Sequence, residues 1–145
     1  MKLYRQAADA GHETAQYNLG FAYVHGDGVP KNPSLGVRWY RLAAEAGDVN
    51  AQRDLGYCLH EGVGVSVDHR EAAGWYRRAA DQGDRKAQYN LGLSYLEGEG
   101  VVCSPRWARY WLQKAAAQGH ARSKVLVRRF AAQQHAAADG ASRRR

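Results

Sequence analysis

The chain has 145 residues, enough for one compact domain or one short solenoid, and a formal net charge of +7. Residues 120–145 hold seven basic residues and one acidic residue, whereas residues 1–119 hold 14 basic and 13 acidic residues. This uneven balance argues against a uniformly basic nucleic-acid-binding surface. Apolar residues make up 45% of the chain and form no run of membrane-spanning length, so we expect no transmembrane helix. Met1-Lys2-Leu3-Tyr4 runs directly into the repeated sequence, so we expect no signal peptide.

A sequence pattern recurs with a period of 36 residues, which indicates stacked supersecondary units. Its repeated parts are an Ala-Ala-x-x-Gly motif, a Leu-Gly pair and a Gly-x-Gly motif. They begin at Ala7, Ala43, Ala79 and Ala115, at Leu19, Leu55 and Leu91, and at Gly26, Gly62 and Gly98. In chain order we predict a partial repeat with only its second helix (1–11), three full repeats (12–47, 48–83 and 84–119), a C-terminal capping helix (120–139) and a disordered basic tail (140–145).

Residues 48–83 illustrate the predicted unit, a pair of antiparallel helices. Asp48 is a suitable N-cap for a first helix that ends near residue 60. Gly62 and Gly64 can adopt the left-handed conformation that ends a helix and turns the chain. Asp68 begins a capping-box pattern for the second helix, which we expect to end at Gly83.

Glycines recur inside the first helices, at Gly20, Gly56 and Gly92, where glycine costs about 1 kcal/mol relative to alanine. A repeated cost indicates a repeated cause, and we expect close approach of the second helix through its Ala-Ala pair. The tryptophans that keep the same period are interpreted as core residues: Trp39, Trp75 and Trp111.

The two ends of the chain depart from the repeat. Leu3-Tyr4 aligns with the middle of a second helix, so the sequence starts midway through a repeat unit, and we expect apolar surface at this end that could support a homodimer. At the other end we predict a helix over 121–138, stopped by Gly140, whose Val127, Phe130 and Ala131 cover the last repeat. The basic tail is interpreted as solvated rather than as a membrane or nucleic-acid contact.

The first helices are expected to line a concave groove that binds a peptide or segment of another protein. Their inward positions vary between copies while the packing positions repeat, although packing between neighbouring first helices is an alternative explanation. We expect Tyr17, Tyr57 and Tyr89 with Arg53 to anchor the partner. Arg53 interrupts the repeated series of Tyr17 and Tyr89, and a charge at this position implies that it is exposed in all three repeats. The predicted groove residues are Tyr17, Phe21, Val24, His25, Arg53, Tyr57, His60, Glu61, Tyr89, Leu93, Leu96 and Glu97.

The sequence contains no recognisable catalytic or metal-binding motif. His25 and His60 could approach across adjacent helices, with Cys58 on the same helix as His60, but no closely spaced ligand pair supports a metal site. The Gly-x-Gly loops lack the strand and lysine of a phosphate-binding loop. Cys58 and Cys103 occupy unrelated repeat positions, which predicts two free thiols and favours a reducing, cytoplasmic compartment, with the periplasm as the alternative. We therefore predict no enzyme activity, cofactor or metal.

The repeated residues resemble the Sel-one-like repeat family, relatives of the tetratricopeptide repeats. The resemblance rests on Ala51 and Leu55-Gly56, on Gly62-x-Gly64-Val65 and on Trp75-Tyr76 with Ala79-Ala80, repeated in register over residues 1–119. It implies an all-α, right-handed solenoid that acts as a protein-interaction scaffold in bacteria and has no catalytic residues. A stacking or self-association module is the alternative function.

Overall fold

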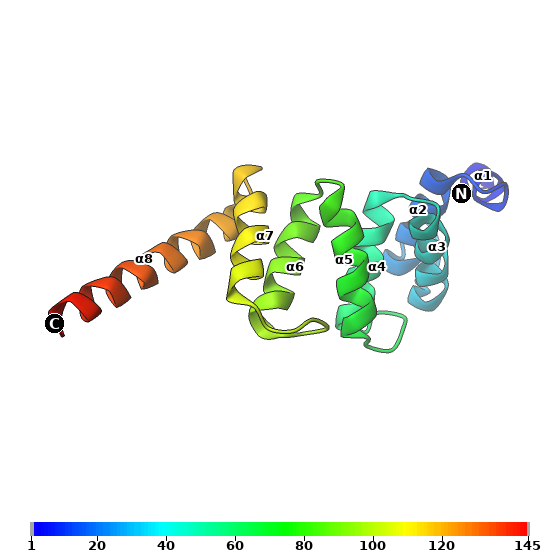
Figure 1. The fold of residues 1–145 in the computed structure, drawn as a ribbon. Helices are drawn as coiled ribbons and strands as arrows, with labels where there is room; N and C mark the ends of the chain where they lie inside the picture. Colours follow the sequence, from blue (N-terminus) through cyan, green and yellow to red (C-terminus); the bar gives the residue numbers. More distant parts are fainter. Residues whose placement is uncertain (1, 145) are drawn as a thin grey trace.

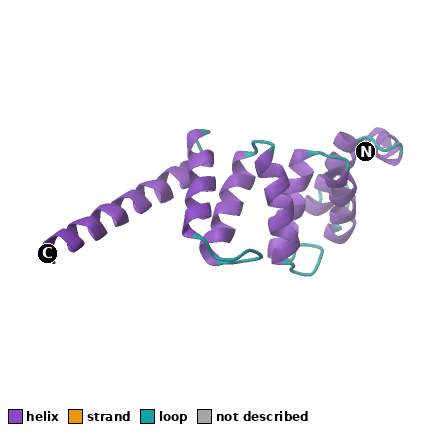
Figure 2. Cartoon of the chain, in the orientation of Figure 1, coloured by secondary structure: helices purple, strands orange, loops and turns teal. Residues whose placement is uncertain are grey.

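The computed structural model describes the backbone of residues 2–144 and the side chains of residues 4–144. Over this range the chain is entirely helical, with short connecting loops and no strand (Figure 2). None of the described helices is both long and apolar enough to cross a membrane. The helices are α1 (Lys2–Asp9), α2 (Glu13–His25), α3 (Pro33–Glu45), α4 (Val49–Glu61), α5 (His69–Asp81), α6 (Arg85–Glu97), α7 (Pro105–Ala117) and α8 (Ala121–Arg143).

The helices stack in the order of the sequence. The closest packing joins α2 to α3, α4 to α5 and α6 to α7, and each pair then packs on the next through α3 with α4 and α5 with α6. The two ends of the chain consequently lie at opposite ends of the stack (Figure 1). Contacts confined to neighbours are the hallmark of a solenoid, so the prediction of an all-helical solenoid is confirmed.

The first helices begin at capped positions, including two that the sequence did not identify as strong caps. Asp48 and Asp84 accept hydrogen bonds from the amides of Ala51 and Ala87 at 2.8 and 2.9 Å. His12 and His120 do the same through Nδ1, at the longer distances of 3.4 and 3.3 Å. Imidazole nitrogen can therefore replace a carboxylate oxygen as the acceptor at this position, because the cap needs only one lone pair.

The glycines inside the first helices are places of close helix approach. A Cβ atom added at Gly56 would lie 2.8 Å from ring carbons of Tyr76 and 3.3 Å from the carbonyl oxygen of Ala72. Gly20 meets Tyr40 and Gly92 meets Leu112 in the same way. The expected cause is thus confirmed, but the expected partner is wrong. The contact is made by the residue after the repeated tryptophan, because the Ala-Ala pair lies further along the second helix.

The repeated tryptophans contribute to the core, as expected. Trp111 and Trp75 are buried, and Trp39 is partly buried against the smaller cluster at the N-terminal end of the stack. Val65 also packs against the main cluster, from the loop between α4 and α5.

Buried glutamines join each repeat to the one before it, a feature that the sequence prediction missed. The Oε1 atoms of Gln52 and Gln88 accept from a second glutamine of the same repeat, at 2.7 and 2.8 Å. Oε1 of Gln16 is buried without a hydrogen-bond partner, because Ala46 stands where the other repeats carry that second glutamine. The Nε2 atom of each buried glutamine donates to a backbone carbonyl of the preceding second helix. Gln16 donates to Ala8 at 3.2 Å, Gln52 to Ala44 at 3.1 Å and Gln88 to Ala80 at 3.3 Å.

The C-terminal helix is longer and less buried than predicted. It continues through Gly140 to Arg143 and projects away from α7 over most of its length (Figure 1). Glycine stops a helix when it adopts a left-handed conformation, which Gly140 does not. The alanine-rich sequence before it favours continuation. Val127 and Phe130 are half-buried as expected, but Ala131 is exposed, so only the first part of α8 covers the last repeat.

Candidate functional site

Two neighbouring hollows follow the first helices, and we call them together the groove. The wide hollow has a volume of about 680 Å³ and is lined by residues of α2, α3, α4 and the first half of α6. The narrow hollow, of about 110 Å³, lies between α4 and α6. Tyr57 lines both hollows. Both hollows thus lie beside the first helices α2, α4 and α6, which were expected to line the groove.

Most of the positions predicted to face inward do line the groove. Val24 also lines the wide hollow, but it is buried and therefore offers little surface to a partner. Tyr89 and Leu96 line neither hollow, and the Tyr89 ring instead lies 4.5 Å from that of His120. The other predicted residues line the wide hollow (Tyr17, Phe21, His25, Arg53 and Tyr57) or the narrow hollow (Tyr57, His60, Glu61, Leu93 and Glu97).

Arg53 is not the exposed residue that the sequence argument required. Its side chain is only 16% exposed, and its guanidinium pairs with Asp54 through Nε and with Asp84 through Nη1, both at 3.0 Å. Asp84 also caps α6, so Arg53 connects α4 to the start of the next repeat. A partly buried arginine is tolerated here because two carboxylates surround it. The inference that a charge at this position means exposure is therefore wrong.

Tyr17 is likewise held by the protein itself. Its hydroxyl donates to Oδ2 of Asp54 at 2.8 Å, and its ring stacks on Tyr40 with 5.5 Å between centroids. Burial, and then the Asp54 carboxylate, raises the pKa of Tyr17 well above its ordinary value. The Tyr17, Asp54 and Arg53 side chains thus line the wide hollow and are connected to one another by hydrogen bonds.

The accessible aromatic side chains of the groove are Phe21 and Tyr57. They are 39% and 53% exposed, which is high for such large apolar surfaces. The His25 ring lies 4.2 Å from that of Phe21. Charge differs between the hollows: Lys31 and Lys86 line the wide one, whereas the carboxylates Glu61 and Glu97 line the narrow one.

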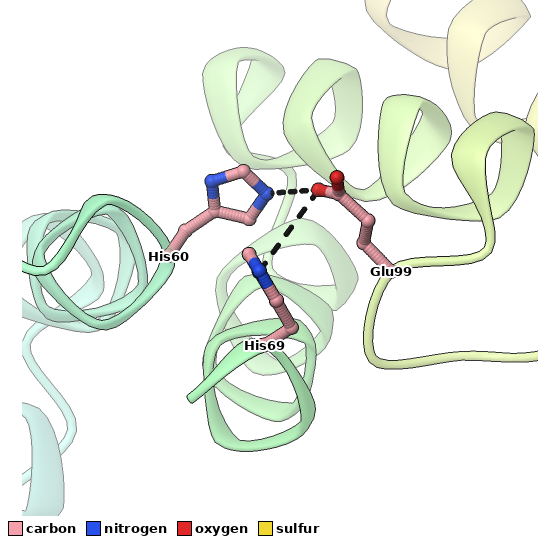
Figure 3. A group of neighbouring side chains, drawn as sticks. All are labelled: His60, His69 and Glu99. Atoms are coloured by element: carbon pink, nitrogen blue, oxygen red, sulfur yellow. Dashed lines mark hydrogen bonds and ion pairs between the residues drawn. The ribbon is translucent and has the colours of Figure 1, made fainter. Parts of the chain in front are cut away.

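The histidines and cysteines are not arranged as the rejected metal hypothesis had placed them. His25 contacts Phe21, and His60 instead meets His69 and Glu99, with their potential ligand atoms all within 4.8 Å of one another (Figure 3). Cys58 and Cys103 are both free thiols, as predicted, the first buried and the second exposed. Burial, and then the Asp54 carboxylate, raises the pKa of Cys58 to about 12, so its thiol is neutral at physiological pH.

Stacked helix pairs with a groove along their first helices define this chain as an α-solenoid repeat protein. The chain belongs to the Sel1 repeat family, whose family model matches residues 1–12, 14–48, 49–84 and 85–120. The resemblance found in the sequence is therefore confirmed. Proteins of this family generally serve as protein-interaction scaffolds.

Solved structures agree with this assignment. The chain is 44% identical to a protective antigen with an SLR fold from uropathogenic Escherichia coli strains, with a TM-score of 0.83 over 85% of this chain and 26% of the antigen. It is 40% identical to a Sel1 repeat protein from Oxalobacter formigenes, with a TM-score of 0.79 over 86% of this chain and 94% of that protein.

Helicobacter pylori cysteine-rich protein B shares the fold at 23% identity, with a TM-score of 0.67 over 86% of this chain and 90% of that protein. This chain spans only about a quarter of the length of the Escherichia coli antigen. A comparison with curated proteins gave no match.

Proposed function

We propose that this chain is a non-catalytic scaffold that holds an extended segment of another protein in the groove along α2, α4 and α6. The observation that carries the proposal is Tyr57, an aromatic residue that is 53% exposed and lines both hollows. Exposed aromatic side chains in a concave surface are the typical energetic centre of a protein interface. The general role of the Sel1 repeat family supports this function.

Of the predicted anchor residues only Tyr57 is retained, and the exposed Phe21 is added to it. Tyr17 and Arg53 already use their polar groups within the chain, and Tyr89 packs beside His120. A partner would therefore gain little hydrogen bonding from these three residues. Phe21 and Tyr57 instead offer apolar area that a bound segment can bury.

The charges of the groove define the chemistry of the proposed partner. Lys31 and Lys86 suit an acidic side chain over the wide hollow, and Glu61 and Glu97 suit a basic side chain over the narrow one. The segment that fits best carries an aromatic or aliphatic residue between them, in contact with Tyr57. An extended conformation suits a groove that crosses successive helices.

A displayed library of short peptides, selected on the tag-free chain, tests this function. Selected peptides are expected to carry an apolar residue flanked by an acidic and a basic residue. They should lose binding to Tyr57→Ala, which removes exposed surface and should leave the fold intact. Tyr110→Ala is the matched control, because Tyr110 is 41% exposed but lines neither hollow. Selected peptides that bind the Tyr57→Ala variant as tightly as wild type would refute the groove as the binding surface.

Self-association through the N-terminal end is the second candidate function. Tyr4 on α1 is 49% exposed, which leaves apolar surface at that end, whereas the side chain of Leu3 lies outside the described residues. Sedimentation equilibrium distinguishes the candidates. A dimer that Tyr4→Ser converts to a monomer supports stacking, and a monomer at all concentrations supports the groove alone.

A further inference from the structure

We propose that His60, His69 and Glu99 bind one divalent transition-metal ion of the zinc class at the junction between the second and third helix pairs. The residues come from the last turn of α4, the first turn of α5 and the loop after α6, and their side chains converge (Figure 3). His60 Nε2 lies 2.6 Å from Glu99 Oε2, and His69 Nδ1 lies 3.9 Å from the same oxygen. This inference does not depend on what the groove binds.

The donor set matches the chemistry of a zinc site. Two imidazole nitrogens and one carboxylate oxygen leave a fourth position for water or another ligand, and zinc accepts this combination. Ligand atoms around a tetrahedral ion at 2.0–2.1 Å lie about 3.3 Å apart. The separations of 2.6 Å and 3.9 Å from Glu99 Oε2 bracket that value, and all three ligand atoms lie within 4.8 Å of one another. Small side-chain rotations are therefore enough to bring all three groups to one ion.

One nitrogen of the cluster lacks the partner that the fold would normally supply. His69 Nδ1 is buried and has no hydrogen-bond partner, although it faces the Glu99 carboxylate. Burying an imidazole nitrogen without a partner is costly. A metal ion between His69, Glu99 and His60 would satisfy this nitrogen.

The equivalent junction one repeat earlier shows that the fold does not need polar residues here. The positions 36 residues before His60, His69 and Glu99 are occupied by Val24, Pro33 and Val63. These three residues all line the wide hollow, and Val24 and Val63 belong to or pack against the main apolar cluster. Three apolar residues thus occupy these positions at the first junction, whereas two histidines and a glutamate, which are common metal ligands, occupy them at the next.

The backbone holds the three proposed ligands in place. The Asp68 amide donates to the Leu59 carbonyl at 2.8 Å, which fixes the start of α5 beside the end of α4. Gly100, with φ of +75°, lies so close to α5 that a Cβ atom there would overlap the His69 carbonyl. Glu99 is therefore carried on a loop segment that is pressed against the first turn of α5.

A second carboxylate orients the first histidine. His60 Nδ1 lies 3.2 Å from Glu61 Oε1. When Nδ1 carries the proton it donates to Glu61, and the Nε2 lone pair then points toward Glu99 and the proposed ion. A carboxylate on the outer nitrogen of a ligating histidine is the usual support for a zinc ligand.

Isothermal titration of the tag-free, chelator-treated chain with zinc chloride tests the proposal. We expect one ion to bind per chain, and His69→Gln to weaken its binding at least tenfold. His135→Gln is the matched control, because His135 is an exposed histidine on α8 outside the cluster, and it should bind as wild type does. Titration with cobalt should give the visible absorption of a tetrahedral site in wild type and in the control.

The triple variant His60→Val, His69→Pro, Glu99→Val rebuilds the apolar trio of the earlier junction. It should keep the helical circular dichroism of wild type and lose the single bound ion. Absence of one-to-one binding by wild type would overturn the proposal, as would unchanged affinity in the triple variant. If the triple variant does not fold, unchanged affinity in His69→Gln overturns it in the same way.

Discussion

Replacing Gly56 by alanine is the sharpest test of the close approach between first and second helices. The added Cβ would lie 2.8 Å from two ring carbons of Tyr76, which is itself buried and has little room to move. Gly74, inside α5, is the matched control, because a Cβ there would meet nothing within 4 Å. The same chemical change is therefore made once in a tight contact and once in solvent.

The two substitutions are expected to change the free energy of unfolding by different amounts. In an exposed helix, alanine is about 1 kcal/mol more favourable than glycine, so Gly74→Ala should stabilise the chain by up to that amount. Overpacking costs about 1–3 kcal/mol, so Gly56→Ala should be less stable than Gly74→Ala by about that difference. Gly56→Leu, whose side chain has no space beside Tyr76, should be more severe and should unfold or strongly destabilise the array.

Urea denaturation followed by circular dichroism at 222 nm measures both variants on the same scale. The reasoning requires the midpoint of Gly56→Ala to lie below that of Gly74→Ala, with similar slopes. Equal midpoints for these two variants would refute the close-approach explanation of the repeated glycines.

Three further predictions follow from the contacts of single residues. Arg53→Glu should destabilise the chain by about 3 kcal/mol or more in urea denaturation, because it removes two ion pairs and gathers carboxylates in a partly buried site; an unchanged midpoint would mean that these pairs contribute nothing. Ala46→Gln should raise the free energy of unfolding by about 1 kcal/mol, because it offers a donor to the buried Oε1 of Gln16, and an unchanged free energy would show that this oxygen is otherwise satisfied. Iodoacetamide should label only Cys103 in the native chain and also Cys58 in denaturant, as read by intact mass, and native labelling of both would contradict the burial of Cys58.

The fold was predictable because the residues that pack the helices together recur at the same positions in each repeat. The Leu55-Gly56 pair and the Gly62-x-Gly64 loop each recur in register, so chance agreement in three copies is excluded. Helical spacing placed most of the predicted groove residues beside the hollows, but not Tyr89 or Leu96. The recurring Ala-Gln pair at Gln52 carried a signal as well, and its period indicates the buried hydrogen bonds that the structure shows.

The state of individual groove residues was not predictable, because it depends on side chains one repeat away. Arg53 is covered because Asp84, at the start of the next repeat, accepts from it. The cluster of His60, His69 and Glu99 escaped motif analysis because its members come from three elements that meet only in the stack. Comparison with Val24, Pro33 and Val63 could have drawn attention to these positions, since a packing position that turns polar in one copy needs a reason.

Mapping of amide chemical shifts tests the central claim, that the groove along α2, α4 and α6 binds a segment of another protein. The isotopically labelled chain is titrated with a peptide selected on wild type. We expect the changes to concentrate at Phe21, Tyr57, Leu93 and their neighbours, and to disappear in Tyr57→Ala but not in Tyr110→Ala. Changes centred instead on α1, or on the second helices α3, α5 and α7, would contradict the account.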